Sequence, residues 1–282
     1  MPHSHGHDHA HDAPLAPAGD GTIAISHLHF RYPDGTEALR GIDLSITGGE
    51  KVALLGPNGA GKSTLMLHLN GIHRPTHGTV HVAGMQVSNE TIGRVRAEVG
   101  LVFQDPDDQL FSPTVWDDVA FGPTHMGLTP GAIHDRVEVA LAAVGALDLA
   151  QRAPMRLSIG QRKRVALATV LAMNPSILVF DEPSAGLDPR GRRELIELLQ
   201  SLTQTLVVST HDLELARATF PRSIVVDRGV IVADGSTSEI LANRELLLAH
   251  GLAQDFAPLS RAARSAAMRS RNSASAPLPD GA

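Results

Sequence analysis

Residues 56–64 read GPNGAGKST; they directly follow the apolar run Val52–Leu55, and a helical pattern then continues to about Leu69. This strand, glycine-rich loop and helix match the phosphate-binding pattern G-x-x-x-x-G-K-[ST] in the context that the pattern requires. Glycines let backbone N–H groups turn toward phosphate oxygens, and the start of the helix adds positive potential. The stretch therefore predicts a nucleotide site, formed by Gly56, Pro57, Asn58, Gly59, Ala60, Gly61, Lys62, Ser63 and Thr64.

Candidate catalytic groups follow a second apolar run, Ile177–Phe180, which ends in Asp181 and Glu182. In such a site Lys62 can reach the β- and γ-phosphates, and the Ser63 hydroxyl can bind magnesium. Asp181 can hold the same ion, and Glu182 is placed to polarise the attacking water as a general base. Taken alone, two acids at a strand end can also be merely solvated. Together with the loop they predict hydrolysis of ATP with magnesium.

A third apolar run, Leu206–Val208, is followed after two polar residues by His211. A single histidine is more often a surface or capping residue, but beside a γ-phosphate it can stabilise developing charge. The three apolar runs favour buried parallel strands. The alternating run Ile23–Phe30 favours an edge strand of an antiparallel sheet, and 224–227 and 230–233 favour a hairpin. Helical patterns dominate from about 112 to 173, which indicates an α/β core with an inserted helical lobe.

Composition separates a folded body, residues 21–256, from two biased ends. Residues 1–20 are rich in His, Asp, Ala and Pro, and residues 257–282 are rich in Ala, Ser and Arg, so we expect both ends to be disordered. The net charge of −6 and the absence of basic runs in the body argue against nucleic acid as a partner. The chain has no cysteine, and its apolar runs are far shorter than the roughly 18 residues of a membrane span. We therefore expect a soluble, cytoplasmic protein.

The sequence LSIGQ, at 157–161, resembles the signature motif of ATP-binding-cassette (ABC) ATPases, which usually reads LSGGQ. The signature residues are Ser158, Ile159, Gly160 and Gln161, with Ile159 at the position of a glycine. Four further residues resemble motifs of the family in the same order: Tyr32 the aromatic that stacks on adenine, Gln104 the Q-loop glutamine that contacts magnesium, Asp188 the D-loop aspartate, and His211 the switch histidine. The resemblance implies an ABC-type fold with a mixed sheet core, an antiparallel β subdomain and a helical lobe. It also implies a head-to-tail dimer with a second copy or a homologous ATPase, in which the signature of one subunit closes on ATP held by the other.

Three further stretches indicate which kind of ABC ATPase the sequence resembles. The stretches at 105–111 (DPDDQLF), 117–128 and 161–189 are similar to the ATPase subunits of energy-coupling-factor importers, which take up vitamins or cobalt and nickel ions. This resemblance implies a peripheral motor on the cytoplasmic face of the membrane. Its partners would be a transmembrane coupling subunit and a substrate-binding membrane subunit.

The substrate class depends on the N-terminal leader, where every second residue from 3 to 11 is histidine. Imidazole suits nickel, cobalt, zinc and copper, and the candidate ligands are His3, His5, His7, His9 and His11. The leader therefore favours metal import, while a solubility role for it and a vitamin importer remain as alternatives. A metal-binding module with a regulatory cassette is a third hypothesis, against which the full set Lys62, Asp181, Glu182 and His211 counts.

Overall fold

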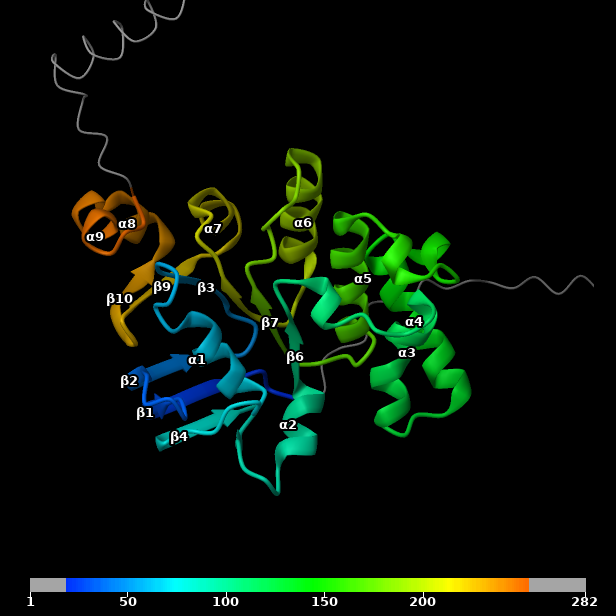
Figure 1. Cartoon of the computed structure of the whole chain (residues 1–282), viewed down its shortest axis with the longest axis horizontal. Coiled ribbons are helices and arrows are strands. Elements are labelled where there is room, and N and C mark those ends of the chain that lie inside the picture. The colour runs from blue at the N-terminus through cyan, green and yellow to red at the C-terminus, as the bar shows by residue number, and fades with distance from the viewer. Residues whose placement is uncertain (1–18, 254–282) are drawn as a thin grey trace, which may run out of the picture.

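A computed structural model of the chain describes residues 19–253, which form two sheets with helices around them (Figure 1). The larger sheet has the order β10-β9-β3-β8-β7-β6 and the smaller one the order β2-β1-β4-β5. The strands are β1 (Ile23–Arg31), β2 (Glu37–Ile46), β3 (Lys51–Leu55), β4 (His77–Val82), β5 (Met85–Gln86), β6 (Val99–Val102), β7 (Ile177–Asp181), β8 (Thr205–Ser209), β9 (Arg222–Asp227) and β10 (Val230–Ser236). The helices are α1 (Lys62–Leu69), α2 (Ile92–Glu98), α3 (Val115–His125), α4 (Pro130–Ala143), α5 (Ile159–Leu171), α6 (Pro189–Ser201), α7 (Leu213–Thr219), α8 (Thr237–Ala242) and α9 (Arg244–Ala249).

In the larger sheet, neighbouring strands from β9 to β6 all run parallel, and only β10 is antiparallel to its neighbour. The predicted parallel strands and the predicted hairpin are thus confirmed. Residues 52–55 and 177–180 are at most 1% exposed, because helices cover one face of this sheet, and helix α1 together with the smaller sheet covers the other. Continuous apolar runs are what such doubly covered strands require.

The prediction that residues 23–30 form an edge strand was wrong, because β1 lies between β2 and β4. Its alternation has another cause. Ile23, Ile25 and Leu28 are buried in the core beneath the smaller sheet, while the residues between them face outward. Any strand of a sheet with one covered face alternates in this way, so the pattern identifies a buried face without identifying the strand's neighbours.

Helices α3, α4 and α5 form the predicted helical lobe, which Figure 1 shows in green beside β6 and β7. Val119, Val137, Leu141 and Val165 are fully buried in a core that continues to the sheet. The structure therefore confirms the α/β fold class with its antiparallel subdomain and inserted lobe. In the described part of the chain, no helix combines the length and apolar character needed to cross a bilayer.

The two ends of the chain lie mostly outside the described residues, and with them the predicted histidine ligands 3, 5, 7, 9 and 11 and the tail 257–282. Gly19 and Asp20 are described. A carboxylate oxygen of Asp20 accepts hydrogen bonds from the Thr22 N–H (3.0 Å) and the Thr22 hydroxyl (2.9 Å), immediately before β1.

Candidate nucleotide-binding site

Four predicted motifs follow four neighbouring parallel strands. The glycine-rich loop follows β3, His211 follows β8, Asp181 and Glu182 lie at the end of β7, and Gln104 follows β6. Because the carboxyl ends of parallel strands share one edge, the fold gathers segments that lie between Gly56 and His211 in the sequence. Open α/β sheets bind ligands at this edge.

The loop needs glycine at two positions for steric reasons. Gly56 has φ 154° and Gly61 has φ 105°, values that are unusual for other residues. A Cβ on Gly56 would lie 2.1 Å from the carbonyl oxygen of Val226, and one on Gly61 would lie 2.8 Å from that of Ala38. Gly61 also caps the start of α1 without a side-chain hydrogen bond, so the first amides of the helix are not satisfied by a cap. Such amides are suited to an anion.

Lys62 is held inside the loop. Lys62 is only 6% exposed, and its Nζ donates hydrogen bonds to the carbonyl oxygens of Gly56 (2.7 Å) and Pro57 (3.1 Å). Burial lowers the pKa of the Lys62 ammonium, and the negative charges of Glu182 and Asp181 partly oppose that shift. The structure thus brings Lys62 near both predicted carboxylates.

A serine of β8, Ser209, links the two carboxylate residues. Its hydroxyl donates to Asp181 Oδ1 at 2.5 Å, and its carbonyl oxygen accepts from the Glu182 N–H at 3.1 Å. Glu182 has φ 45°, an uncommon conformation for a residue other than glycine, and its residue is 7% exposed. Strained, buried residues of this kind cluster at functional sites because the surrounding structure holds them in place.

Glu182 and His211 form a direct pair. His211 Nδ1 lies 2.9 Å from Glu182 Oε2, and since a carboxylate only accepts, Nδ1 is the donor. The Glu182 side chain is 10% exposed and that of His211 is 68% exposed, so the acid lies deep and the ring reaches solvent. This arrangement pairs a buried carboxylate with an imidazole that reaches solvent.

Three candidate magnesium ligands offer the oxygen chemistry that this ion prefers. They are the Ser63 hydroxyl on the first turn of α1, the Asp181 carboxylate and the Gln104 amide. Ser63 and Gln104 are exposed, and Asp181 is half-buried and already oriented by Ser209. The residues present therefore fit a magnesium ion at the phosphates.

Tyr32, the residue expected to stack on adenine, lies next to the end of the glycine-rich loop. Its hydroxyl shares a hydrogen bond of 2.9 Å with the Thr64 hydroxyl, and the rings of Phe30 and His73 pack edge-on against it at 4.9 and 5.5 Å. The hydrogen bond to Thr64 attaches Tyr32 to the first turn of α1. One turn further along α1, burial lowers the pKa of His68 to about 4, so that its ring stays neutral and its Nδ1–H donates to the Thr64 carbonyl.

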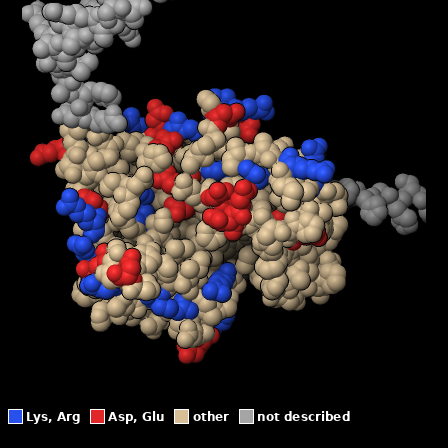
Figure 2. Space-filling view, in the orientation of Figure 1, with Lys and Arg blue, Asp and Glu red and all other residues tan. Residues whose placement is uncertain are grey.

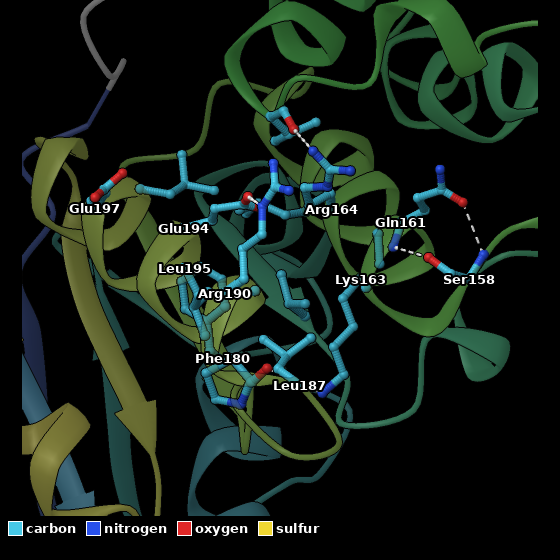
Figure 3. A pocket seen from close by; sticks show the side chains of 18 of the residues that line it. Ser158, Gln161, Lys163, Arg164, Phe180, Leu187, Arg190, Glu194, Leu195 and Glu197 are labelled. Atoms are coloured by element: carbon cyan, nitrogen blue, oxygen red, sulfur yellow. Dashed lines mark hydrogen bonds and ion pairs between the residues drawn. The ribbon is translucent and has the colours of Figure 1, made fainter.

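The signature residues lie at the start of α5, away from the glycine-rich loop. Ser158 caps α5 in a reciprocal pair with Gln161, and Ile159 is 39% exposed. Figure 1 shows α5 in the lobe, separated from α1 by β6 and β7. Gly160 and Asp188 line a cavity of about 590 Å³ between α5 and α6, with Ser158 at one end of the view in Figure 3. Within one chain, the fold does not bring the signature to the glycine-rich loop.

Sequence reasoning missed the residues that join the Q-loop to the signature helix. Gln109 Nε2 donates to the Ala166 carbonyl and the Thr169 hydroxyl, both at 2.7 Å, and its Oε1 accepts from the Phe103 N–H. An ion pair of 3.4 Å between Arg162 and Asp107 joins the same two segments. Both Asp107 and Gln109 belong to the DPDDQLF stretch, which pointed to the region but not to these contacts.

Comparison with known proteins identifies the family. The sequence model of the ABC transporter family matches residues 39–185. The chain belongs to the ABC transporter family. It is 50% identical over 233 residues to the energy-coupling factor transporter ATP-binding protein EcfA of Carboxydothermus hydrogenoformans, covering 82% of this chain and 86% of the relative. It is 47% identical over 230 residues to EcfA of Methanothermobacter thermautotrophicus, covering 80% and 74%.

Solved structures of ABC ATPases are also similar to this chain. The chain is 38% identical to cbiO1 of Clostridium perfringens, part of the ABC transporter complex cbiONQ, with a TM-score of 0.73 over 88% of this chain and 99% of that one. It is 27% identical to a dimeric ATP-binding cassette in a post-hydrolysis state with ADP and Pi, with a TM-score of 0.69 over 76% and 98%. This ABC protein is thus the ATP-binding and ATP-hydrolysing subunit of a transporter, and the resemblance to energy-coupling-factor ATPases is confirmed.

Proposed function

We propose that this ABC ATPase is the motor of an energy-coupling-factor importer and that the importer carries cobalt or nickel ions. The main support for the role as an ATP-hydrolysing motor is that the Glu182–His211 pair lies at the same edge of the larger sheet as Lys62. The relatives named EcfA and the likeness to cbiO1 support the class of importer. The histidine-rich leader supports a metal as the substrate.

In the proposed mechanism, the amides of residues 56–64 and Lys62 bind the phosphates. Ser63, Asp181 and Gln104 would hold magnesium, which when bound neutralises phosphate charge. Glu182 accepts a proton from the attacking water at a carboxylate oxygen, and His211, held by that residue, stabilises charge that develops on the γ-phosphate.

A second subunit completes the site. We infer a head-to-tail dimer in which Ser158 and Gly160 of the partner subunit close over the γ-phosphate. The start of α5 is capped only by its own Ser158 and Gln161 and is exposed, so its remaining amides can meet an anion held by another chain. The dimeric cassette with ADP and Pi supports this arrangement.

The proposed contact with the transmembrane coupling subunit is an apolar patch between the Q-loop segment and α3. Phe111 is 68% exposed and Phe121 is 45% exposed, and their rings meet edge-on with centroids 5.0 Å apart. Asp118, which is buried, fixes this arrangement by accepting from the Phe111 N–H at 3.1 Å. Asp107 and Asp108, in the same segment as Phe111, are exposed and add negative charge, and Figure 2 shows acidic side chains gathered on the visible face. A partner with an apolar ridge and basic flanks fits this surface.

Replacing the two phenylalanines by serine should separate docking from hydrolysis. We expect the double variant Phe111→Ser, Phe121→Ser to lose co-purification with membrane subunits and coupled uptake, while ATP turnover of the isolated chain stays within about twofold, because neither ring touches the catalytic groups. Val139→Ser, at a 55% exposed apolar residue of α4, is the matched control. Equal loss of turnover and uptake would mean that the rings only support the fold.

The leader should bind metal without serving hydrolysis. Five imidazoles within eleven residues give a high local concentration of ligands, so we expect weak, unselective binding of nickel or cobalt that declines as pH falls through the histidine range. Isothermal titration of the full chain and of a chain lacking residues 2–12 measures this, beside an ATPase assay in which the two should agree. Equal nickel binding by both chains would remove the leader as a ligand site and leave the vitamin importer as well supported as the metal importer.

A further inference from the structure

Strand β9 continues the row of strand ends on the far side of β3. It runs parallel to β3, so its last residue, Asp227, reaches the same edge of the sheet as the phosphate loop. Asp227 Oδ2 lies 2.9 Å from Nδ1 of His250, and because a carboxylate has no donor, the imidazole Nδ1–H donates this bond. The two side chains are 18% and 22% exposed, so the pair is largely shielded from water. His250 caps the carboxyl end of α9.

The turn after Asp227 is bonded to the phosphate loop. Arg228 and Gly229 have φ values of 47° and 79° and form a two-residue hairpin turn into β10. The Gly229 N–H donates to the carbonyl oxygen of Ala60 at 2.9 Å, and the Gly229 carbonyl accepts from the Arg40 N–H at 2.8 Å. The turn is thereby fixed between the loop and β2.

Residues next to Asp227 and His250 also lie against the phosphate loop. The Val226 carbonyl oxygen, next to Asp227, occupies the space where a Cβ on Gly56 would fall. At Gly251, next to His250, an added Cβ would lie 3.9 Å from the Cβ of Pro57. Residues adjoining both members of the pair therefore border the loop at Gly56 and Pro57, while Gly229 holds Ala60.

We propose that His250 and Asp227 are positioning residues for the phosphate loop. Their hydrogen bond joins the end of α9 to the end of β9, and the residues beside each partner hold the loop in the conformation that receives ATP. This inference rests on the proposed role of residues 56–64 in binding phosphates. Both residues lie beyond 39–185, the segment matched by the family model, and neither reaches the catalytic carboxylates through any described hydrogen bond.

The test is ATP affinity of the full chain. We expect His250→Ala and Asp227→Ala each to raise the Kd for ATP with magnesium about fivefold, with turnover at saturating ATP changed less than about twofold. The double variant should bind no more weakly than either single variant, because both changes remove one bond. His250→Asn, whose amide NH₂ can replace the Nδ1–H donor, should restore affinity to within about twofold of wild type. A merely structural role would lower the melting temperature without this split or this rescue.

Two reference variants separate the possible failures. Asp43→Ala removes a second His–Asp pair, between His27 Nδ1 and Asp43 Oδ2 at 2.9 Å, which is exposed, and it should leave the Kd unchanged. Lys62→Ala should weaken ATP binding by about a hundredfold or more. Unchanged ATP affinity in His250→Ala and Asp227→Ala, with that loss of affinity in Lys62→Ala, would overturn the positioning role alone. Wild-type ATP affinity in Lys62→Ala would instead overturn the assignment of the loop.

Discussion

Glu182→Gln is expected to lower ATP turnover by roughly a hundredfold to ten-thousandfold while ATP still binds. The amide keeps the shape of the side chain, and its oxygen can still accept the bond from His211 Nδ1, which lies 2.9 Å from Oε2 in the native chain. It cannot take a proton from water at neutral pH, so the chemical step loses its base. Steady-state phosphate release and equilibrium ATP binding measure the two properties separately.

The same variant should accumulate as an ATP-bound dimer, because the closed state forms but does not hydrolyse its nucleotide. Light scattering with saturating ATP and magnesium detects this dimer. Glu197→Gln, on the exposed face of α6, is the matched control and should behave as wild type. Monomers alone in Glu182→Gln under these conditions would contradict the head-to-tail dimer, and wild-type turnover would contradict the role of Glu182 as base.

Lys62→Ala is expected to weaken ATP binding by about a hundredfold or more and to abolish turnover. The variant removes the buried cation that the loop holds through the Gly56 and Pro57 carbonyls, and with it the charge that neutralises the β- and γ-phosphates. Isothermal titration with ATP and magnesium measures the loss.

Lys51→Ala is a demanding control for this experiment. Lys51 is the first residue of β3, burial also lowers its pKa, and its Nζ donates to the carbonyls of Leu199 (2.9 Å) and Gln200 (2.8 Å). Its loss should destabilise the fold without reducing ATP affinity. If the two variants bound ATP equally well, the phosphate-binding role of Lys62 would be wrong.

Much of this site could be predicted from sequence because its motifs are local. The glycine pattern of 56–64 depends on backbone angles within one loop, and continuous apolar runs mark strands that are covered on both faces. Side-chain contacts between neighbouring strands have no comparable pattern in the sequence. The parallel register that opposes Asp181 to Ser209 arises only in the assembled sheet, so the serine that orients both carboxylate residues was not recognised.

Other features depend on packing between segments far apart in the chain. The alternation of residues 23–30 was compatible with an edge or an inner strand, and the pairing of β1 with β4 decided between them. Gln109 acts through α5, 57 residues later, and His250 is 23 residues from Asp227. No local pattern encodes these partners, because each is fixed by the tertiary contacts of a whole helix or strand.

The most direct test of the proposed motor is ATP-driven uptake of radiolabelled nickel and cobalt into vesicles containing this chain and the membrane subunits with which it co-purifies. We predict that uptake of one or both ions depends on ATP with the wild-type chain and is lost with Glu182→Gln. Uptake that is equal with the two chains, or ATP-driven uptake of a vitamin with neither metal transported, would contradict the proposal.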